Sequence, residues 1–138
     1  MALTDDLVGR TYAPTAPYEV TAVKVREFTA ATQGEVPDAD RDAPAIAPTF
    51  PIVLAFDAMN AFLAAEGIDL ARIVHGDQGF RYDRPVRIGD RLVATLEVAS
   101  ARRVRDMDII GTSSVITDAD GERVLVATAT LIHRGGDA

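Results

Sequence analysis

The spacing of hydrophobic positions changes once along this chain of 138 residues, close to residue 73. Before that point, apolar residues recur three or four positions apart in two segments, which is the spacing of a helix that buries one side. After it they alternate with polar residues, as in strands with one buried face. Helices followed by consecutive strands indicate an α+β fold with an antiparallel sheet of about five strands.

The first helical segment covers residues 22–31. It follows an irregular arm that contains two prolines and a short run, residues 18–20, where we expect a brief strand. Thr21 is suited to cap the helix because its hydroxyl can accept a hydrogen bond from the first turn. Gly34 is expected to end it. This part of the chain therefore predicts a short strand, a capped helix and then a break.

The second helical segment reads "PIVLAFDAMNAFLAAEG" and covers residues 51–67. Pro51 suits the first helical position, Gly67 suits the C-terminal cap, and Ile68 is placed to fold back onto the last turn. The polar residues within the segment are Asp57, Asn60 and Glu66. A helix that is apolar on most sides is normally enclosed by its own domain, so we expect a central core helix.

Four β-rich runs follow, and short turn sequences separate them. The runs are residues 76–85, 91–100, 107–118 and 122–134. The turn "RIGD", with Gly89, is expected to join the first two runs, and "DADG" at residues 118–121 the last two. A sheet this small leaves exposed edges, which pairing with another copy or a relative would cover. Without internal repeats, residues 1–138 are expected to form a single domain.

The charge and composition exclude several classes of function. A net charge of −7 argues against nucleic acid as a partner, because phosphate binding needs a surplus of Lys and Arg. The chain has no cysteine, which removes disulfides, thiolate metal sites and cysteine nucleophiles. Its two histidines, His75 and His133, are too far apart to suggest a metal site, and no cofactor is predicted. The longest apolar stretch contains Asp57 and Asn60 and is shorter than the ~20 residues of a membrane span, so we expect a cytoplasmic protein that does not contact membranes.

Several motifs resemble the MaoC-like (R)-specific dehydratase/hydratase family. They are "LVGRTYAPTAPYEVTAVKVREFTAAT" (7–32), "APTFPIVL" (47–54), "VHGDQGFRYDRPV" (74–86) and "RPVRIGDRL" (84–92). The opening motif is similar to the N-terminal-type MaoC domain, which includes the Had-like A-type subunits of (3R)-hydroxyacyl-ACP dehydratases. The resemblance implies a hotdog fold, in which an antiparallel sheet wraps around a long central helix.

The resemblance also implies a reaction, the reversible removal of water from a (3R)-3-hydroxyacyl thioester. Active members of the family supply an aspartate and a histidine from a Gly-Asp-x-Asn-Pro-x-His loop, and backbone N–H groups at the start of the central helix hold the thioester carbonyl. The matching loop here is "QGEVPDADRDAPAIAPTFP", residues 33–51. It contains carboxylates but no histidine, and no histidine follows before His75. We therefore predict that this chain has no catalytic residues of its own.

The candidate substrate-binding residues are Thr49, Phe50, Ile52, Phe56, Asp57, Met59, His75 and Gly76. Thr49 stands at the helix start, where active members have a small glycine, so close approach of a thioester becomes harder. The apolar candidates either line an acyl tunnel or pack in the core, and the pattern leaves both possibilities open.

The polar candidates also have two interpretations each. Asp57 either makes a structural hydrogen bond or subunit contact, or faces the substrate. His75 is a hydrogen-bonded structural histidine or a base, and His133 is expected at the surface. The basic cluster "RRVRD" at 102–106 is a solvated strand end or a contact for an acidic carrier or a CoA phosphate. A histidine beside a carboxylate at a tunnel mouth would contradict the non-catalytic interpretation.

These observations lead to one leading function and two alternatives. The leading prediction is a non-catalytic, substrate-channel subunit of a heterodimeric (3R)-3-hydroxyacyl-ACP or -CoA dehydratase, paired with a catalytic MaoC-like subunit. One alternative is a hotdog acyl-thioesterase in which Glu35 or Asp57 activates water. The other is a homodimeric protein that binds acyl thioesters without catalysis.

Overall fold

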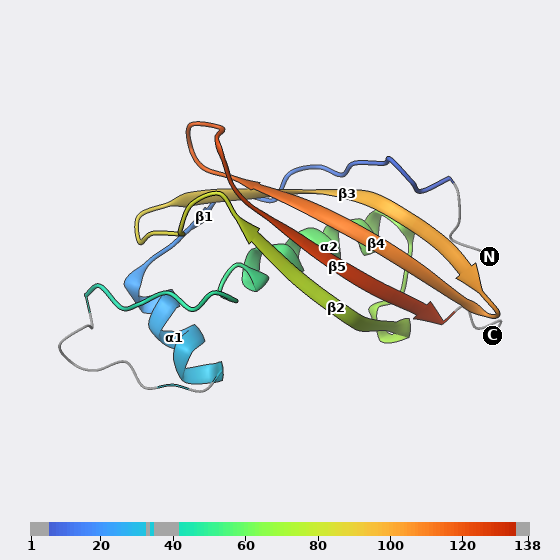
Figure 1. The fold of residues 1–138 in the computed structure, drawn as a ribbon, viewed down its shortest axis with the longest axis horizontal. Coiled ribbons are helices and arrows are strands. Elements are labelled where there is room, and N and C mark those ends of the chain that lie inside the picture. The colour runs from blue at the N-terminus through green and yellow to red at the C-terminus, as the bar shows by residue number, and fades with distance from the viewer. Residues whose placement is uncertain (1–5, 33, 35–41, 135–138) are drawn as a thin grey trace.

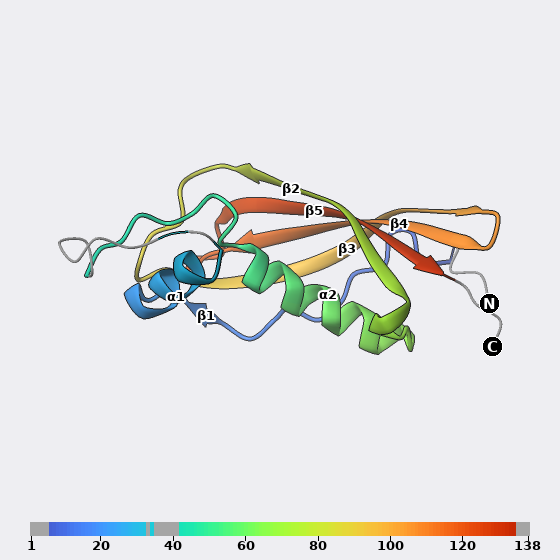
Figure 2. The same ribbon diagram turned by 90° about the horizontal axis from the view of Figure 1, so that it is seen from below.

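The structure is a computed structural model that describes residues 6–32, 34 and 42–134. An antiparallel sheet curls around one long helix (Figures 1 and 2), and its five strands lie in the order β1-β3-β4-β5-β2. The elements are β1 (Tyr18–Glu19), α1 (Ala22–Thr32), α2 (Ile52–Glu66), the 3-10 turn η2 (Leu70–Arg72), β2 (Ile73–Tyr82), β3 (Arg91–Val104), β4 (Met107–Thr117) and β5 (Arg123–Arg134). The expected α+β layout is confirmed, with the long helix against the sheet.

The two helices begin and end close to where their capping residues predict. The Thr21 hydroxyl accepts a hydrogen bond of 3.2 Å from the backbone N–H three residues later, at the start of α1. Helix α2 begins directly after Pro51 and ends at Gly67, whose φ of 68° is the left-handed conformation that glycine adopts easily. The N–H of Ile68 then donates to the carbonyl of Leu63 at 2.9 Å, which folds the chain back onto the last turn.

Helix α2 is buried on one face only. The side chains that face the sheet and are buried are Leu54, Ala58, Met59, Phe62 and Leu63. Phe56 is 43% exposed, and Asp57 beside it is also exposed. The prediction that its own domain encloses this helix is therefore wrong for this face. The physical reason is that the sheet curls around a single side of α2 (Figure 2), and an apolar composition does not reveal which neighbour covers each face.

The predicted hairpin between the first two β-rich runs is also wrong. Strand β2 pairs with β5, and β3 pairs with β4, so β2 and β3 lie on different sides of the sheet. Residues 83–90 form a connection between them. Gly89 does provide the expected turn, with a φ of 99°, but its N–H donates to the carbonyl of Val20 after β1 rather than closing a β2–β3 hairpin. Turn residues indicate where the chain reverses its direction locally. They do not indicate which strands pair on either side of the turn.

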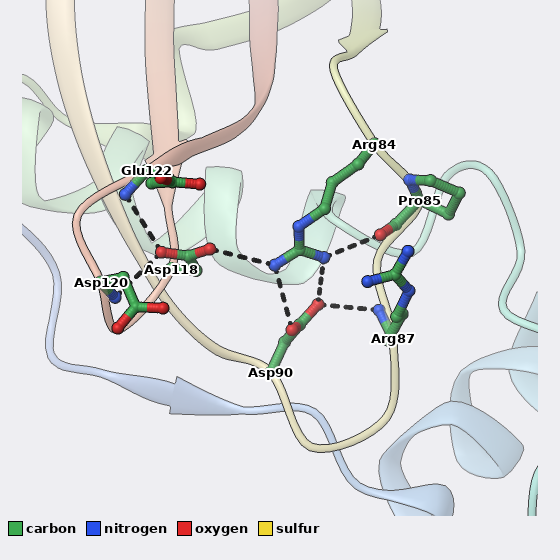
Figure 3. Close-up of polar contacts among 7 residues, drawn as sticks. All are labelled: Arg84, Pro85, Arg87, Asp90, Asp118, Asp120 and Glu122. Atoms are coloured by element: carbon green, nitrogen blue, oxygen red, sulfur yellow. Dashed lines mark hydrogen bonds and ion pairs between the residues drawn. The ribbon is translucent and has the colours of Figure 1, made fainter.

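An ion cluster holds this connection against the β4–β5 turn (Figure 3). The Arg84 guanidinium donates to both Asp90 oxygens, at 2.9 and 3.1 Å, and to Asp118 at 3.3 Å. Burial disfavours the charge on Asp90, but hydrogen bonds from Arg84 and from the Arg87 backbone outweigh it, and the pKa of Asp90 is lowered. The pKa of Asp118 is lowered, chiefly by a hydrogen bond from the backbone N–H of Glu122 in the same turn. The "RPVRIGD" motif is thus a structural clamp.

The N-terminal arm covers the β3 side of the sheet, where it follows the strand in Figure 1. The Gly9 N–H donates to the Val98 carbonyl at 2.8 Å, and the Val98 N–H donates back to Arg10 at 3.0 Å. The Tyr12 N–H donates to Leu96 at 3.1 Å. With the arm and β1 on this side, the uncovered edge within the described part of the chain is β2.

A polar contact ties the arm to the end of α2, and we expect it to be pH-dependent. The Tyr12 hydroxyl donates to the Glu66 carboxylate, and this bond lowers the pKa of Glu66, while burial and then the same carboxylate raise the pKa of Tyr12. A carboxylate whose pKa is lowered by folding contributes stability above its unfolded pKa and loses it as the pH falls through the folded pKa. Tyr12→Phe should therefore cost about 1 kcal/mol at neutral pH, and the difference should shrink in acid, where the protonated carboxyl is a weaker acceptor.

Chemical denaturation followed by circular dichroism from neutral to acid pH measures this dependence. Tyr18→Phe is the matched control, because the Tyr18 ring packs on Phe50 and is not hydrogen-bonded to Glu66. A Tyr12→Phe penalty that stays constant down to acid pH would show that the ring, and not the hydrogen bond, holds the arm.

Candidate functional site

A trough of small side chains crosses the concave face of the sheet beneath α2. Two neighbouring cross-strand pairs form its floor, namely Ser114–Ala127 and Thr112–Ala129. Larger pairs flank them on both sides, namely Ile116–Leu125 and Ile110–Leu131. Because the side chains between the flanking pairs are short, the floor is lower there and space remains under the helix.

Helix α2 and strand β2 complete a small cavity over this floor. Its walls are Ile52, Ala55, Phe56, Met59, His75, Gln78, Leu96, Thr112, Ser114, Ala127 and Ala129. The free volume is about 10 Å³, enough for one water molecule. An acyl chain therefore needs wall side chains to move, and Phe56, which is part-exposed, is one that can do so.

His75 is at the rim of the cavity, and its partner is an amide. Its Nε2 lies 2.9 Å from Oε1 of Gln78, three residues further along β2. No aspartate or glutamate is among the described residues that line the cavity. The ring is exposed and accessible, and its printed hydrogen-bond partner is an amide rather than a carboxylate.

His133 does contact a carboxylate, at a different place. Its Nδ1 lies 3.3 Å from Asp108, and Arg103 donates to the other oxygen of Asp108 at 3.2 Å. Asp108 is fully buried and the His133 side chain is 12% exposed, so the expectation of a surface histidine is wrong. None of these three residues lines the cavity. The register explains the contact, because Asp108 and His133 are directly opposite on β4 and β5 and point to the same buried face.

A histidine beside a carboxylate at the mouth of a tunnel would contradict the non-catalytic interpretation. Neither histidine has this arrangement among the described residues. His75 borders the cavity without a carboxylate, and His133 has a carboxylate without a cavity.

The other predicted site residues divide between the cavity and other environments. Ile52, Phe56, Met59 and His75 meet at the cavity. Phe50 is buried in the core, with its ring centroid 5.5 Å from that of Phe28 in an edge-on contact. Thr49 and Asp57 are exposed. Gly76 lies at a register shift in β2, where a Cβ atom would approach Ile132 to 3.3 Å. Glu35 and the acidic loop at residues 35–41 lie outside the described residues.

Sequence reasoning missed the floor of the trough and Gln78. A signal was present: the runs "GTSSVI" and "VATAT" interrupt large apolar positions with small ones at period two. Small residues on a buried strand face mark a place where another atom must fill the space.

A second, wider groove lies beside the start of α2. It has a volume of about 440 Å³ and is lined by Ile46, Ala47, Pro48, Tyr82, Asp83, Arg84, Pro85 and Val86. The Tyr82 hydroxyl donates to the Pro48 carbonyl and so joins the end of β2 to the segment before the helix. Burial raises the pKa of Tyr82, which keeps this hydroxyl a donor.

Two classes of site find no support in the described ranges. No group of three or more His, Asp or Glu side chains there is arranged to hold a metal ion. No helix among these residues is long and apolar enough to cross a bilayer.

A five-stranded sheet curled around one helix, with a narrow cavity between them, defines a hotdog domain of the MaoC-like dehydratase class. The family described as "FAS1-like, dehydratase domain region" matches residues 6–127, and the chain belongs to this family.

Relatives and solved structures agree with this assignment. A UPF0336 protein from Streptomyces coelicolor is 39% identical over 149 aligned residues, covering 99% of each chain. The chain is 29% identical, with a TM-score of 0.78, to the C-terminally truncated HadBC complex, a (3R)-hydroxyacyl-ACP dehydratase from Mycobacterium tuberculosis; the match covers 94% of this chain and 99% of that one. A MaoC-like dehydratase is 28% identical with a TM-score of 0.79, over 92% of this chain and 42% of its own.

Proposed function

We propose that this chain is a non-catalytic subunit of a heterodimeric (3R)-3-hydroxyacyl thioester dehydratase, in which it supplies a wall of the acyl channel. The observation that carries the proposal is the cavity under α2, whose described lining has a histidine at its rim and no carboxylate. Similarity to a chain of the HadBC complex supports the reaction class and the pairing of unlike subunits.

The chemistry explains why such a site needs a partner. Dehydration requires a base at the α-carbon and a group that protonates the departing β-hydroxyl. His75 offers one imidazole, and its hydrogen bond to Gln78 does not set a second titrating group beside it. Active members of the family divide these two proton transfers between an aspartate and a histidine, and the described lining of this cavity offers only a histidine.

The free edge of the sheet fits the position of that partner. Within the described residues, strand β2 pairs with β5 on one side, and its other edge presents unpaired backbone groups. Exposed apolar side chains lie on and next to this edge, with Val74 50% exposed and Phe56 43% exposed. A strand added here would cover both residues and place the cavity rim, with His75, at the subunit interface.

Co-purification and a hydration assay test the proposal. The purified chain alone is expected not to hydrate crotonyl-CoA, whereas a complex with a MaoC-like subunit that carries the aspartate–histidine loop should do so. The reading frame next to this gene is the first candidate partner. Robust turnover by the isolated chain would disprove the proposal.

His75 provides a sharper prediction within the active complex. We expect His75→Gln to leave kcat within about threefold of the wild-type complex, because a positioning or rim residue contributes far less than a general base, which gives 10² or more. Substituting the histidine of the partner's own loop serves as the positive control and should abolish turnover. A hundredfold loss in kcat for His75→Gln would assign the base to this chain instead.

The two alternative functions have weaker support. Asp57 does not line the cavity, which removes it as the water-activating group of a thioesterase acting there, and Glu35 lies outside the described residues. A homodimeric acyl-thioester binder would use the same β2 edge. Calorimetry with acyl-CoA, with and without the partner, separates it from the leading proposal.

A further inference from the structure

The β3–β4 hairpin ends in a two-residue turn with an unusual backbone. Val104 and Met107 are directly paired, so Arg105 and Asp106 form the turn. Arg105 has a φ of 58°, and among the described residues it is the one residue other than glycine in the left-handed region. The Arg103 Nε donates to the Arg105 carbonyl at 3.2 Å and so holds the turn in place. Glycine or asparagine is favoured at such a position, so this hairpin keeps an arginine where a smaller residue would be less strained.

The same hairpin carries aliphatic side chains between arginines on the convex face of the sheet. Ile109 on β4 pairs with Arg102 on β3 and with Ile132 on β5. In the next row, Met107 pairs with Arg134. Directly paired side chains point to the same face, and these β4 positions alternate with the buried ones that face α2. Together with the arginine of the turn, these residues form the hairpin patch: Arg102, Arg105, Met107, Ile109, Ile132 and Arg134.

The hairpin patch is open and positively charged. The hairpin extends past the end of α2 (Figure 2), and its aliphatic side chains are half-buried while its arginines are exposed. Arg102, Arg105 and Arg134 form no salt bridge with any residue that the structure describes. Against these three charges, the turn itself contributes the exposed carboxylate of Asp106. A local surplus of positive charge on a chain with a net charge of −7 favours an anionic partner at this place.

The spacing of the arginines suits a helix. Strands β3 and β5 are two strand spacings apart, roughly 10 Å, so Arg102 and Arg134 stand on opposite sides of β4. An α-helix with its side chains is about 10–12 Å wide. The apolar stripe of a helix placed along β4 would rest on Met107 and Ile109, and acidic residues on its two flanks would meet the arginines.

Other anionic partners fit the hairpin patch less well. A nucleic-acid backbone is bound through its phosphates and gains nothing from a strip of aliphatic side chains. The net charge of −7 opposes the approach of the whole chain to an anionic bilayer. Methionine and arginine are both enriched in surfaces that bind other proteins.

We propose that the hairpin patch is a docking surface for an acidic amphipathic helix of a partner protein. Arg102 and Arg134 bind carboxylates on the two sides of the helix, and Arg105 is retained in its strained turn because it binds another. The inference goes beyond the proposed function and does not depend on it, since the patch and the cavity lie on opposite faces of the sheet.

Fluorescence anisotropy with two labelled helical peptides tests the inference. One peptide has leucine at every third or fourth position, glutamate on both flanks of this stripe and alanine elsewhere, and the other has glutamine in place of glutamate. The full chain should bind the acidic peptide at least about tenfold more tightly than the glutamine peptide. Arg102→Glu should weaken binding of the acidic peptide about tenfold. Arg91→Glu makes the same change in net charge at the exposed far end of β3 and should keep binding within about twofold of wild type.

Arg105→Gly separates docking from folding. Glycine adopts a φ of 58° without strain, so this variant should have an unchanged or higher Tm and yet bind the acidic peptide about fivefold more weakly. Equal binding of the two peptides, equal effects of Arg102→Glu and Arg91→Glu, or wild-type affinity in Arg105→Gly overturns the inference. Binding to vesicles of phosphatidylglycerol but not to the acidic peptide also overturns it and assigns the patch to a lipid surface. The hydration assay of the complex tests the proposed function separately.

Discussion

Removing both partners of Asp108 is expected to cost about 3–5 kcal/mol of the free energy of unfolding. In the double variant Arg103→Met/His133→Leu, the fully buried Asp108 carboxylate loses its contacts at 3.2 and 3.3 Å. The new side chains offer no group that replaces these contacts. Urea unfolding at neutral pH measures the loss. The reason for its size is that the remaining group is charged and desolvated, so the penalty exceeds the value of the lost hydrogen bonds.

A triple variant identifies the origin of this loss. Adding Asp108→Leu removes the buried charge and should recover most of the stability, because an apolar side chain suits the buried face of β4. Arg102→Met, at an exposed neighbouring position, is the matched control and should change stability by no more than about 0.5 kcal/mol. If the triple variant is as unstable as the double variant, the loss of stability came from packing and not from the buried carboxylate left without partners.

Filling the trough should have the largest effect on function. We expect Ala129→Leu to weaken acyl-thioester binding, and turnover by the complex, by about a hundredfold. The added side chain would occupy the floor beneath α2, where about 10 Å³ is free. Binding isotherms and the crotonyl-CoA hydration rate measure the effect.

The control for this variant uses the neighbouring residue on the other face of β5. Thr128 is exposed, so Thr128→Leu introduces the same side chain away from the cavity and should leave binding unchanged. Overpacking alone costs about 1–3 kcal/mol, and circular dichroism will show whether Ala129→Leu remains folded. A folded Ala129→Leu variant with normal binding would mean that the acyl chain does not follow the trough.

The ends of the helices were predictable because their signals are local. Thr21 caps α1, and Gly67 adopts the left-handed conformation that ends α2, each through hydrogen bonds to residues within one or two turns. The strands were predictable for a similar reason, since alternation depends only on which face of each strand is buried. Their pairing was not: the "RIGD" turn looked like a hairpin, yet β2 pairs with β5.

The candidate site was predicted on one wall only. The helix side of the cavity, Ile52, Phe56 and Met59, followed from the resemblance and from apolar spacing. The opposite wall consists of Thr112, Ser114 and their neighbours on β5, and it depends on register between strands distant in sequence. The same register brings Asp108 beside His133 across the sheet, a contact that alternation cannot reveal because it gives the face of a residue but not its cross-strand partner.

By itself, then, the amino-acid order determined the helices, the strands, the α+β class and the absence of any histidine between Gly34 and Val74. Only the tertiary structure decided which strand edge stays open, which face of α2 is uncovered, and which small side chains form a trough. The physical reason is the range of the interactions: caps, turns and periodicity act within a few residues, whereas strand pairing and cavities join residues far apart in the chain.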